Sequence, residues 1–278
     1  MTFFVFSAIL GAALLHASWN ALVKNSADKI QSMLVLTLMH GILGAIIAYF
    51  VKIPEVEVWP WLIASAFFHV FYQCCLALAY NAGDLSRVYP IARGTAPLLV
   101  LLIFYFIIET SMTNAEIIGV LLLGLGILSM AKGIFSNREN LTLLPYTFGA
   151  AIGTAGYTIS DGIGARVSND PSSYIAWLFI LTVPIFFLVI FIFKGIKIFK
   201  IEQATWKVGS AAGLFSFGSY WIAIWAMMKA PIPLVAALRE TSILFAFLIG
   251  AVIFKDKITL KKISAAALIL LGIVIIRL

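Results

Sequence analysis

The chain has 278 residues, of which 63% are hydrophobic and 11% are charged, and its mean hydropathy is +1.07. Soluble domains carry about 25% charged and 45–50% apolar residues, so this composition excludes an ordinary soluble domain and indicates an integral membrane protein. The formal charge of +7 lies mostly between apolar runs, where lysine and arginine orient membrane helices, so we expect no nucleic-acid partner.

Apolar runs follow one another along the whole chain with short connections. Most are close to the roughly 20 residues that a helix needs to cross the hydrocarbon core. Strand-like alternation is absent. We therefore expect an all-α membrane protein with ten transmembrane helices, near residues 2–23, 30–52, 58–80, 86–107, 115–132, 144–165, 172–193, 206–229, 232–253 and 260–277.

Lysine and arginine are concentrated in the connections that follow the first, third, fifth, seventh and ninth runs. Basic residues are enriched on the cytoplasmic side of membrane proteins. Their distribution therefore predicts that both termini lie outside the cytoplasm.

The two halves of the chain resemble each other. A shift of 146 residues places Arg93 on Arg239 and Thr95 on Thr241, and the alignment continues without a gap through the following run. Repeats of five spans each have opposite orientations, because five is odd. We therefore expect an inverted repeat, with a first five-helix unit at 1–138 and a second at 139–278. Many secondary transporters have this architecture, with the substrate site between the repeats near the bilayer midplane.

Two arginines lie well inside apolar runs. Arg93 is about seven residues into the fourth run, in the stretch that also contains Tyr89, and Arg239 lies equally deep in the ninth, beside Glu240. Charges at this depth cost a few kcal/mol, so they face a cavity or a partner. Either the arginines bind an anionic group of a substrate, as guanidinium binds carboxylate or phosphate, or they form a structural ion pair with Glu240 or Asp161. A third arrangement combines both, with Glu240 neutralising one arginine while the other meets the ligand.

Proline and glycine accompany both arginines. Pro90, Gly94 and Pro97 lie at the start of the fourth run, and Pro231 and Pro233 open the ninth. These residues interrupt helical hydrogen bonding, which membrane proteins tolerate where the backbone lines a cavity. We therefore expect interrupted helices around a central cavity.

The first run contains a polar face. His16 and Asn20 are four residues apart and share it, and Trp19 lies between them. His16 is either a proton carrier or a histidine that bonds a neighbouring helix. Asp161 and Glu240 are further candidates for proton coupling.

Polar and aromatic residues also occur within the third, sixth and eighth runs. The sequence does not decide whether Tyr72 or Gln73 faces inward, and His69 is a weaker candidate. Mid-span rings either pack or cradle an ammonium group by cation–π attraction. The expected substrate-binding residues are Arg93, Arg239, Glu240, His16, Trp19, Asn20, Gln73, Tyr89, Tyr157, Asp161 and Tyr220.

Catalytic and cofactor motifs are absent from the sequence. It has no nucleophile elbow, no zinc-binding His-Glu-x-x-His and no phosphate-binding Gly-x-x-x-x-Gly-Lys loop, and its three histidines are dispersed. We expect no enzyme activity, no cofactor and no metal site.

Four segments resemble a known family. They are HASWN at 16–20, GDLSRVYPIARGTAPLL at 83–99, AGYTISDGIGARVS at 155–168 and APIPLVAALRETSILFA at 230–246. With them the chain resembles, over essentially its whole length, the EamA-type carriers of the drug/metabolite transporter superfamily. Its motifs are most similar to the phosphonate-utilisation-associated branch.

The resemblance implies a multi-pass secondary carrier of the inner membrane, working by alternating access as a monomer or homodimer. It implies ten helices from a duplicated five-helix unit, and a central cavity lined by spans 1, 3, 4, 6, 8 and 9. It also implies cytoplasmic termini, against the charge distribution. The expected substrate is a small polar zwitterionic or anionic metabolite, such as an amino acid, aminophosphonate or phosphate ester. The alternatives are a carrier for choline-like quaternary amines and, in a different class, a lipid flippase or channel.

Overall fold

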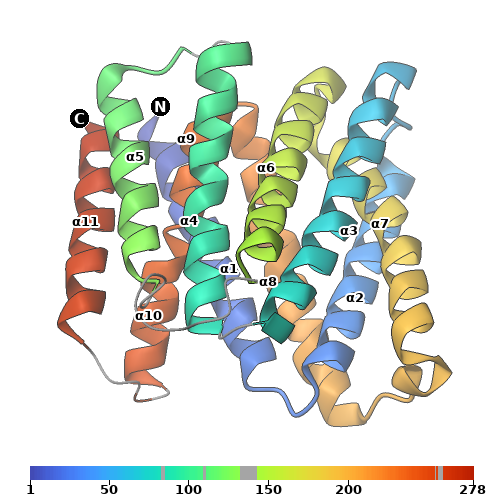
Figure 1. Cartoon of the computed structure of the whole chain (residues 1–278). Helices are drawn as coiled ribbons and strands as arrows, with labels where there is room; N and C mark the ends of the chain where they lie inside the picture. Colours follow the sequence, from blue (N-terminus) through green and yellow to red (C-terminus); the bar gives the residue numbers. More distant parts are fainter. Residues whose placement is uncertain (83–84, 109–110, 132–142, 254, 256–258) are drawn as a thin grey trace. The chain divides into compact units, whose positions relative to one another are not determined.

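The computed structural model describes residues 1–82, 85–108, 111–131, 143–253, 255 and 259–278 (Figure 1). In these ranges every regular element is a helix. The α-helices are α1 (Phe3–Lys24), α2 (Lys29–Phe50), α3 (Trp59–Ala82), α4 (Leu85–Ile103), α5 (Asn114–Ser129), α6 (Leu143–Ser168), α7 (Pro171–Lys194), α8 (Gln203–Met227), α9 (Ile232–Arg239), α10 (Ser242–Val252) and α11 (Leu260–Arg277). The π-helical η2 (Phe104–Ile108) continues α4, and the short 3₁₀ helices η1 (Val56–Val58) and η3 (Ile196–Phe199) precede α3 and α8.

The predicted apolar runs coincide with these helices. In the described part of the chain, five helical segments are long and apolar enough to cross a membrane: Phe3–Lys24, Lys29–Phe50, Pro90–Ile108, Pro171–Lys194 and Ile232–Val252. The shorter apolar helix Asn114–Ser129 adds to them. The all-α membrane fold is thus supported, while ten spans and their inverted symmetry stay predictions. The predicted boundary at 138/139 lies outside the described residues.

Side chains at the helix starts satisfy backbone N–H groups that have no partner within the helix. Thr2 accepts a hydrogen bond from the Val5 amide, and Asp28 accepts one from Gln31. At α5, Thr113 and Glu116 bind each other's backbone amides in a capping box. These short polar residues mark where the apolar runs become helical, because the first amides of a helix have no partner within it.

The described chain divides into two compact units. The first unit consists of residues 67–159 and 229–278 together with Met1, and the second of residues 2–66 and 160–228. α3 and α6 therefore contribute one end to each unit. Each unit contains residues from both halves of the sequence. The two units are therefore not the two predicted repeats, each of which is one continuous half of the chain.

The first unit contains closely packed helices. Gly119 on α5 and Gly272 on α11 face each other: a Cβ added at either would lie 2.7 Å from the other's carbonyl oxygen. A Cβ at Gly94 of α4 would lie 2.8 Å from the Leu128 side chain of α5. Small residues let helix backbones approach, which is a principal source of helix association in membranes.

Gly94 therefore has a packing role. α4 is a continuous helix with Pro90 and Pro97 inside it, so the fourth run has no break, and the interruption is limited to the hydrogen bonds that the two prolines cannot donate. A proline removes one helical N–H and tends to kink a helix. Between and beside its two prolines, α4 packs on α5 through Gly94 and Leu98.

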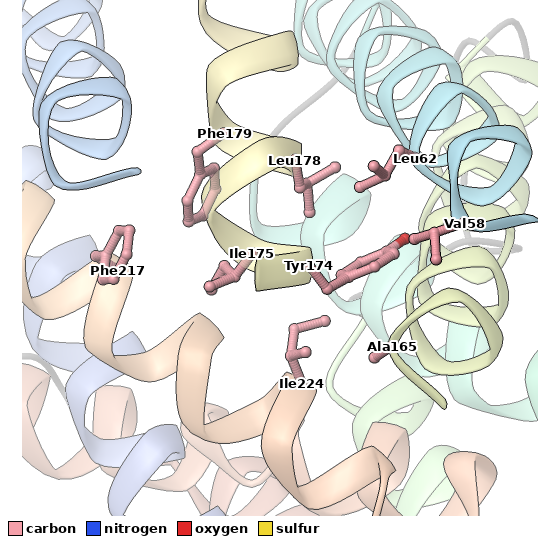
Figure 2. Close-up of a cluster of buried hydrophobic side chains, with 9 residues drawn as sticks. All are labelled: Val58, Leu62, Ala165, Tyr174, Ile175, Leu178, Phe179, Phe217 and Ile224. Atoms are coloured by element: carbon pink, nitrogen blue, oxygen red, sulfur yellow. The ribbon is translucent and has the colours of Figure 1, made fainter. Parts of the chain in front are cut away.

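The second unit has an apolar core between α7, α8 and the ends of α3 and α6. Tyr174, Ile175 and Leu178 of α7 are fully buried against Leu62 and Ile224. Figure 2 shows the Tyr174 ring extending from α7 towards Val58, Leu62 and Ala165. This core holds Tyr174 in a fixed position, which matters for the polar group at its tip.

Candidate functional site

A buried ion pair joins α4 to the segment between α9 and α10 in the first unit. The Nη1 of Arg93 donates to both carboxylate oxygens of Glu240, at 3.1 and 3.4 Å. Arg93 is 9% exposed and Glu240 is 7% exposed. Removing both charges from water is costly, and their attraction offsets this cost only in close geometry. The depth of Arg93 in its apolar run is therefore matched by a carboxylate from the other half of the sequence.

Glu240 lies where the ninth apolar run is broken. α9 ends at Arg239 and α10 begins at Ser242. Between them the backbone hydrogen bonds span three residues, where an α-helix has four. The Glu240 amide donates to the Ala237 carbonyl at 3.0 Å, and the Thr241 amide donates to the Leu238 carbonyl at 3.1 Å. The Thr241 hydroxyl also donates to the Leu238 carbonyl, at 2.7 Å. The predicted interruption is thus present in the ninth run, but after Arg239 and not at its prolines.

A break of this kind is a frequent feature of transporter sites. Discontinuous membrane helices place backbone dipoles and polar side chains near the bilayer midplane, where substrates and coupling ions bind. Irregular backbone at this depth is tolerated where it is buried in protein or lines a cavity. The break at Glu240 and Thr241 thus places a buried carboxyl group and a buried hydroxyl group in the first unit.

An aromatic group of the first unit lies near the ion pair. The buried ring of Tyr157 on α6 stacks on His69 of α3, with centroids 4.1 Å apart and planes inclined by 19°. Tyr72 meets Tyr157 edge-on, at 5.9 Å between centroids. The Tyr157 phenol lies within the electrostatic influence of Arg93, Arg239 and Glu240. Arg93, Arg239 and Glu240 therefore lie in one neighbourhood of the first unit, beside the Tyr157 ring.

Glycines of α6 let the aromatic group form. A Cβ at Gly153 would lie 2.9 Å from the backbone of Tyr72, and one at Gly156 would lie 2.5 Å from the ring of Phe68. α6 therefore packs directly on α3, and this contact brings Tyr157 onto His69 and Tyr72.

A second polar group belongs to the second unit. Asp161 of α6 is 0% exposed, and its two carboxylate oxygens accept hydrogen bonds from two phenols. Tyr174 of α7 donates to Oδ1 at 3.0 Å, and Tyr220 of α8 donates to Oδ2. Gly164, one turn after Asp161, makes room: a Cβ there would lie 2.5 Å from the Tyr174 ring. Three helices thus converge on one buried carboxylate.

The predicted polar face of α1 also lies in the second unit. The rings of His16 and Trp19 meet edge-on with centroids 5.1 Å apart, and the Asn20 side-chain amide donates to the His16 carbonyl at 2.8 Å. Trp19 packs against a buried cluster that includes Leu36 and Ala212. Asn20 is thus bound to its own helix, and Trp19 takes part in packing.

The predicted site residues therefore separate into two groups. Arg93, Glu240 and Tyr157 gather in the first unit together with Arg239, while Asp161 and Tyr220 gather in the second. Gln73 is half-buried on α3, beside Tyr72, and the Tyr89 side chain lies outside the described part of the chain.

Two tyrosines of these polar and aromatic groups, Tyr72 and Tyr174, were not among the expected site residues. The sequence left open whether Tyr72 or Gln73 faces inward, and the structure places Tyr72 against Gly153 of α6 and edge-on to Tyr157. Nothing in the sequence marked Tyr174 as a site residue, because a tyrosine at the start of an apolar run is also typical of the membrane interface.

Among the described residues, no group of three or more His, Cys, Asp and Glu side chains is placed to hold a metal ion.

Residues 142–278 match the model of the EamA-like transporter family, which is slightly less than half of the chain. This is a family of transporters and not of enzymes, in agreement with the expectation that the chain is not an enzyme. No curated protein matches the chain.

A solved structure described as "Crystal structure of protein" is similar in fold, with a TM-score of 0.75 and 18% sequence identity. The match covers 99% of this chain and 96% of the other. At this identity the likeness shows the fold alone. Together with the apolar helices, the family match indicates a multi-pass membrane protein whose residues 142–278 are similar to EamA-like transporters.

Proposed function

We propose that the protein is a secondary transporter of the inner membrane that moves a small polar zwitterionic or anionic metabolite by alternating access. The observation that carries this proposal is the buried Arg93–Glu240 pair at the break between α9 and α10. The match of residues 142–278 to the EamA-like transporter family supports the transporter class.

The charges around the break favour a ligand with an anionic group. Arg239 is half-buried, adjoins Glu240 in the chain and acts on the same Tyr157 phenol as Arg93 does. Guanidinium stays charged and binds carboxylate or phosphate with two parallel hydrogen bonds. We assign the substrate's anionic group to Arg239, whose guanidinium lies in the same neighbourhood as the Arg93–Glu240 pair.

Glu240 gives the same site an acidic group. An amine of a zwitterion would meet its carboxylate, which Arg93 positions through the bonds at 3.1 and 3.4 Å. Amino acids and aminophosphonates carry both groups within a few bonds of each other. A phosphate ester without an amine would use Arg239 alone.

A quaternary amine is the second candidate substrate, and the aromatic group favours it. His69, Tyr72 and Tyr157 bring three rings together in the first unit. Aromatic faces bind ammonium groups by cation–π attraction, at about 0.5–2 kcal/mol. Such a carrier would depend on these rings and would be indifferent to Arg239.

The proposal is tested by ligand-induced thermal stabilisation of the purified protein. The panel contains alanine, aminomethylphosphonate, glycerol phosphate and choline, with wild type, Arg239→Gln and Arg239→Lys. The control is Lys261→Gln, which removes an exposed positive charge at the start of α11. A ligand that binds the folded state stabilises it by mass action.

We expect the zwitterionic or anionic compounds to raise the melting temperature of wild type and Lys261→Gln. Arg239→Gln should lose this rise, and Arg239→Lys should retain part of it, because the charge remains without the two-pronged geometry. Stabilisation by choline alone, unchanged in Arg239→Gln, would contradict the proposal and support the quaternary amine carrier.

A further inference from the structure

One end of the second unit is strongly basic. Residues 24–31, around the start of α2, and residues 194–207, from the end of α7 to the start of α8, contain six lysines and two acidic residues. At the opposite end of these helices, residues 52–57 and 166–170 contain two basic and three acidic residues. Counting six minus two and two minus three, the formal charge is +4 at one end and −1 at the other.

Hydrogen bonds hold the connection between α7 and α8 against the start of α2. Gly195, with a φ of 72°, turns the chain from α7 into η3. The side-chain amide of Gln31 on α2 then donates to the carbonyl oxygens of Ile198 and Lys200, at 3.1 Å each. Lys200 therefore lies beside the turn of α2 that begins at Lys29.

Packing contacts bring the remaining lysines to the same end. The Phe199 ring of η3 stacks on Phe187 of α7, with centroids 5.7 Å apart and planes inclined by 22°. A Cβ at Gly209 of α8 would lie 3.0 Å from the Ser32 carbonyl oxygen, so the start of α8 packs on the start of α2. Three stretches of sequence thus contribute to one lysine surface, which consists of Lys29, Lys194, Lys197, Lys200 and Lys207.

The lysine surface combines charge with exposed apolar groups. Its five lysines are exposed, and none forms an ion pair with another described residue. Beside them Phe193 is 74% exposed, Ile196 is 70% exposed and Trp206 is 40% exposed. α2 and α7 are both long and apolar enough to cross a membrane, so their ends reach the headgroup region. Long basic and aromatic side chains suit this region, where one end is apolar and the other is wet.

We propose that the lysine surface binds an anionic phospholipid. The ammonium groups of Lys29, Lys197 and Lys200 contact the phosphate of the headgroup, and Phe193 and Ile196 contact the acyl chains beside it. A free phosphate carries the same charge but has no chains, so a lipid is the occupant that uses both features of the surface. The binding does not depend on the proposed transport function.

Basic residues at a membrane surface also orient helices during insertion, a role that needs no bound lipid. The two roles differ in the folded protein, because only a binding surface distinguishes anionic from zwitterionic headgroups. Headgroup selectivity is therefore the property to measure.

Native mass spectrometry of the purified protein in detergent measures this selectivity, because it counts bound lipids. The probes are dioleoyl phosphatidylglycerol, which is anionic, and dioleoyl phosphatidylcholine, which has the same chains and no net charge. Wild type should bind phosphatidylglycerol more tightly. Each lysine near an anionic lipid surface contributes a factor of about five, so Lys29→Gln/Lys197→Gln/Lys200→Gln should bind phosphatidylglycerol at least about tenfold more weakly. Its binding of phosphatidylcholine should equal that of wild type.

A matched control removes the same charge elsewhere. Lys52→Gln/Lys229→Gln/Lys261→Gln replaces three exposed lysines outside the lysine surface and should keep the wild-type preference. Glycerol phosphate, which has the charge without the chains, should not displace the lipid at equal concentration.

Equal binding of the two lipids by wild type would overturn the proposal. A preference that survives in the test variant, or that the control variant loses equally, would contradict it too, since the lysines would then act only through net charge or helix orientation. Displacement by glycerol phosphate would indicate a phosphate site and rule out the lipid surface. If the triple variant cannot be purified, Lys29→Gln, Lys197→Gln and Lys200→Gln are measured singly, and unchanged binding in all three rejects the proposal.

Discussion

Arg93 of α4 and Glu240 between α9 and α10 are 147 positions apart in the chain, and yet Arg93 Nη1 lies 3.1 Å from Glu240 Oε1. The pair ties the fourth apolar run to the ninth inside one compact unit. It also places a carboxylate and a guanidinium at the break in the ninth run. The same two residues therefore link two distant segments of the chain and carry buried charges at the break.

The pair predicts a strong double-mutant effect. Arg93→Gln or Glu240→Gln should each lower the free energy of unfolding by about 3–5 kcal/mol, because each leaves a buried charge without its partner. The double variant Arg93→Gln/Glu240→Gln should lose less than the sum, since no charge is then stranded. Denaturant unfolding of the purified proteins measures the free energy of unfolding of wild type, both single variants and the double variant. Additive losses would show that the two side chains do not interact.

The ion pair also shows what could be predicted from the sequence. The depth of Arg93 and Arg239 in apolar runs indicated that each needs a partner or a cavity, and the helices follow the apolar runs closely. The sequence left open whether Glu240 or Asp161 pairs with an arginine, because that choice depends on which helices meet. Hydrophobic periodicity carries no such information.

The helix interruptions were predicted only in part. Pro90, Gly94 and Pro97 favoured a break in the fourth run, but Gly94 serves the packing of α4 on α5 and the helix continues. The break in the ninth run lies at Glu240 and Thr241, where no proline or glycine marks it. There the Thr241 hydroxyl bonds the Leu238 carbonyl, a local competitor of helical hydrogen bonds. Tyr174 was not predicted because its hydrogen bond to Asp161 depends on how α7 packs against α6, where Gly164 leaves room for the ring.

Close packing of α5 on α11 predicts a contrast between two glycines. Gly119→Ala should destabilise the protein by about 1–3 kcal/mol, because its Cβ would lie 2.7 Å from the Gly272 carbonyl oxygen and 2.5 Å from Ile276. Gly11→Ala on α1 is the matched control, since nothing lies within 4 Å of its Cβ. The control should be neutral or stabilising by up to about 1 kcal/mol, as alanine favours helix. Equal effects in thermal unfolding would contradict the packing described for α5 and α11.

The Asp161 group predicts a cost for losing one phenol. Tyr174→Phe keeps the ring in its apolar core but leaves Asp161 Oδ1 without the bond at 3.0 Å. We expect a loss of about 1–3 kcal/mol in unfolding free energy, the cost of an unsatisfied buried acceptor. Tyr146→Phe, on an exposed position of α6, is the control and should change stability by less than about 0.5 kcal/mol. A Tyr174→Phe variant as stable as this control would show that the hydrogen bond contributes nothing.

The aromatic group predicts how the two candidate substrates differ. His69→Ala removes the ring that stacks on Tyr157 at 4.1 Å, and it leaves Arg239 and Glu240 in place. If the substrate is zwitterionic or anionic, the variant should bind it with only a modest loss, within about tenfold. Calorimetric titration of wild type and His69→Ala with alanine and choline measures the difference. Selective loss of choline binding, with no alanine binding in wild type, would favour the quaternary amine carrier.

Counterflow in vesicles containing the purified protein tests the proposed transport function most directly. Vesicles are loaded with unlabelled alanine or aminomethylphosphonate, and uptake of the same labelled compound is followed for wild type, Arg239→Gln and Lys261→Gln. We expect saturable uptake that internal substrate stimulates, present in wild type and Lys261→Gln and lost in Arg239→Gln. Uptake that does not saturate and does not respond to internal substrate would indicate a channel and contradict the proposed transporter function. Uptake unchanged in Arg239→Gln would remove the arginine from the substrate site.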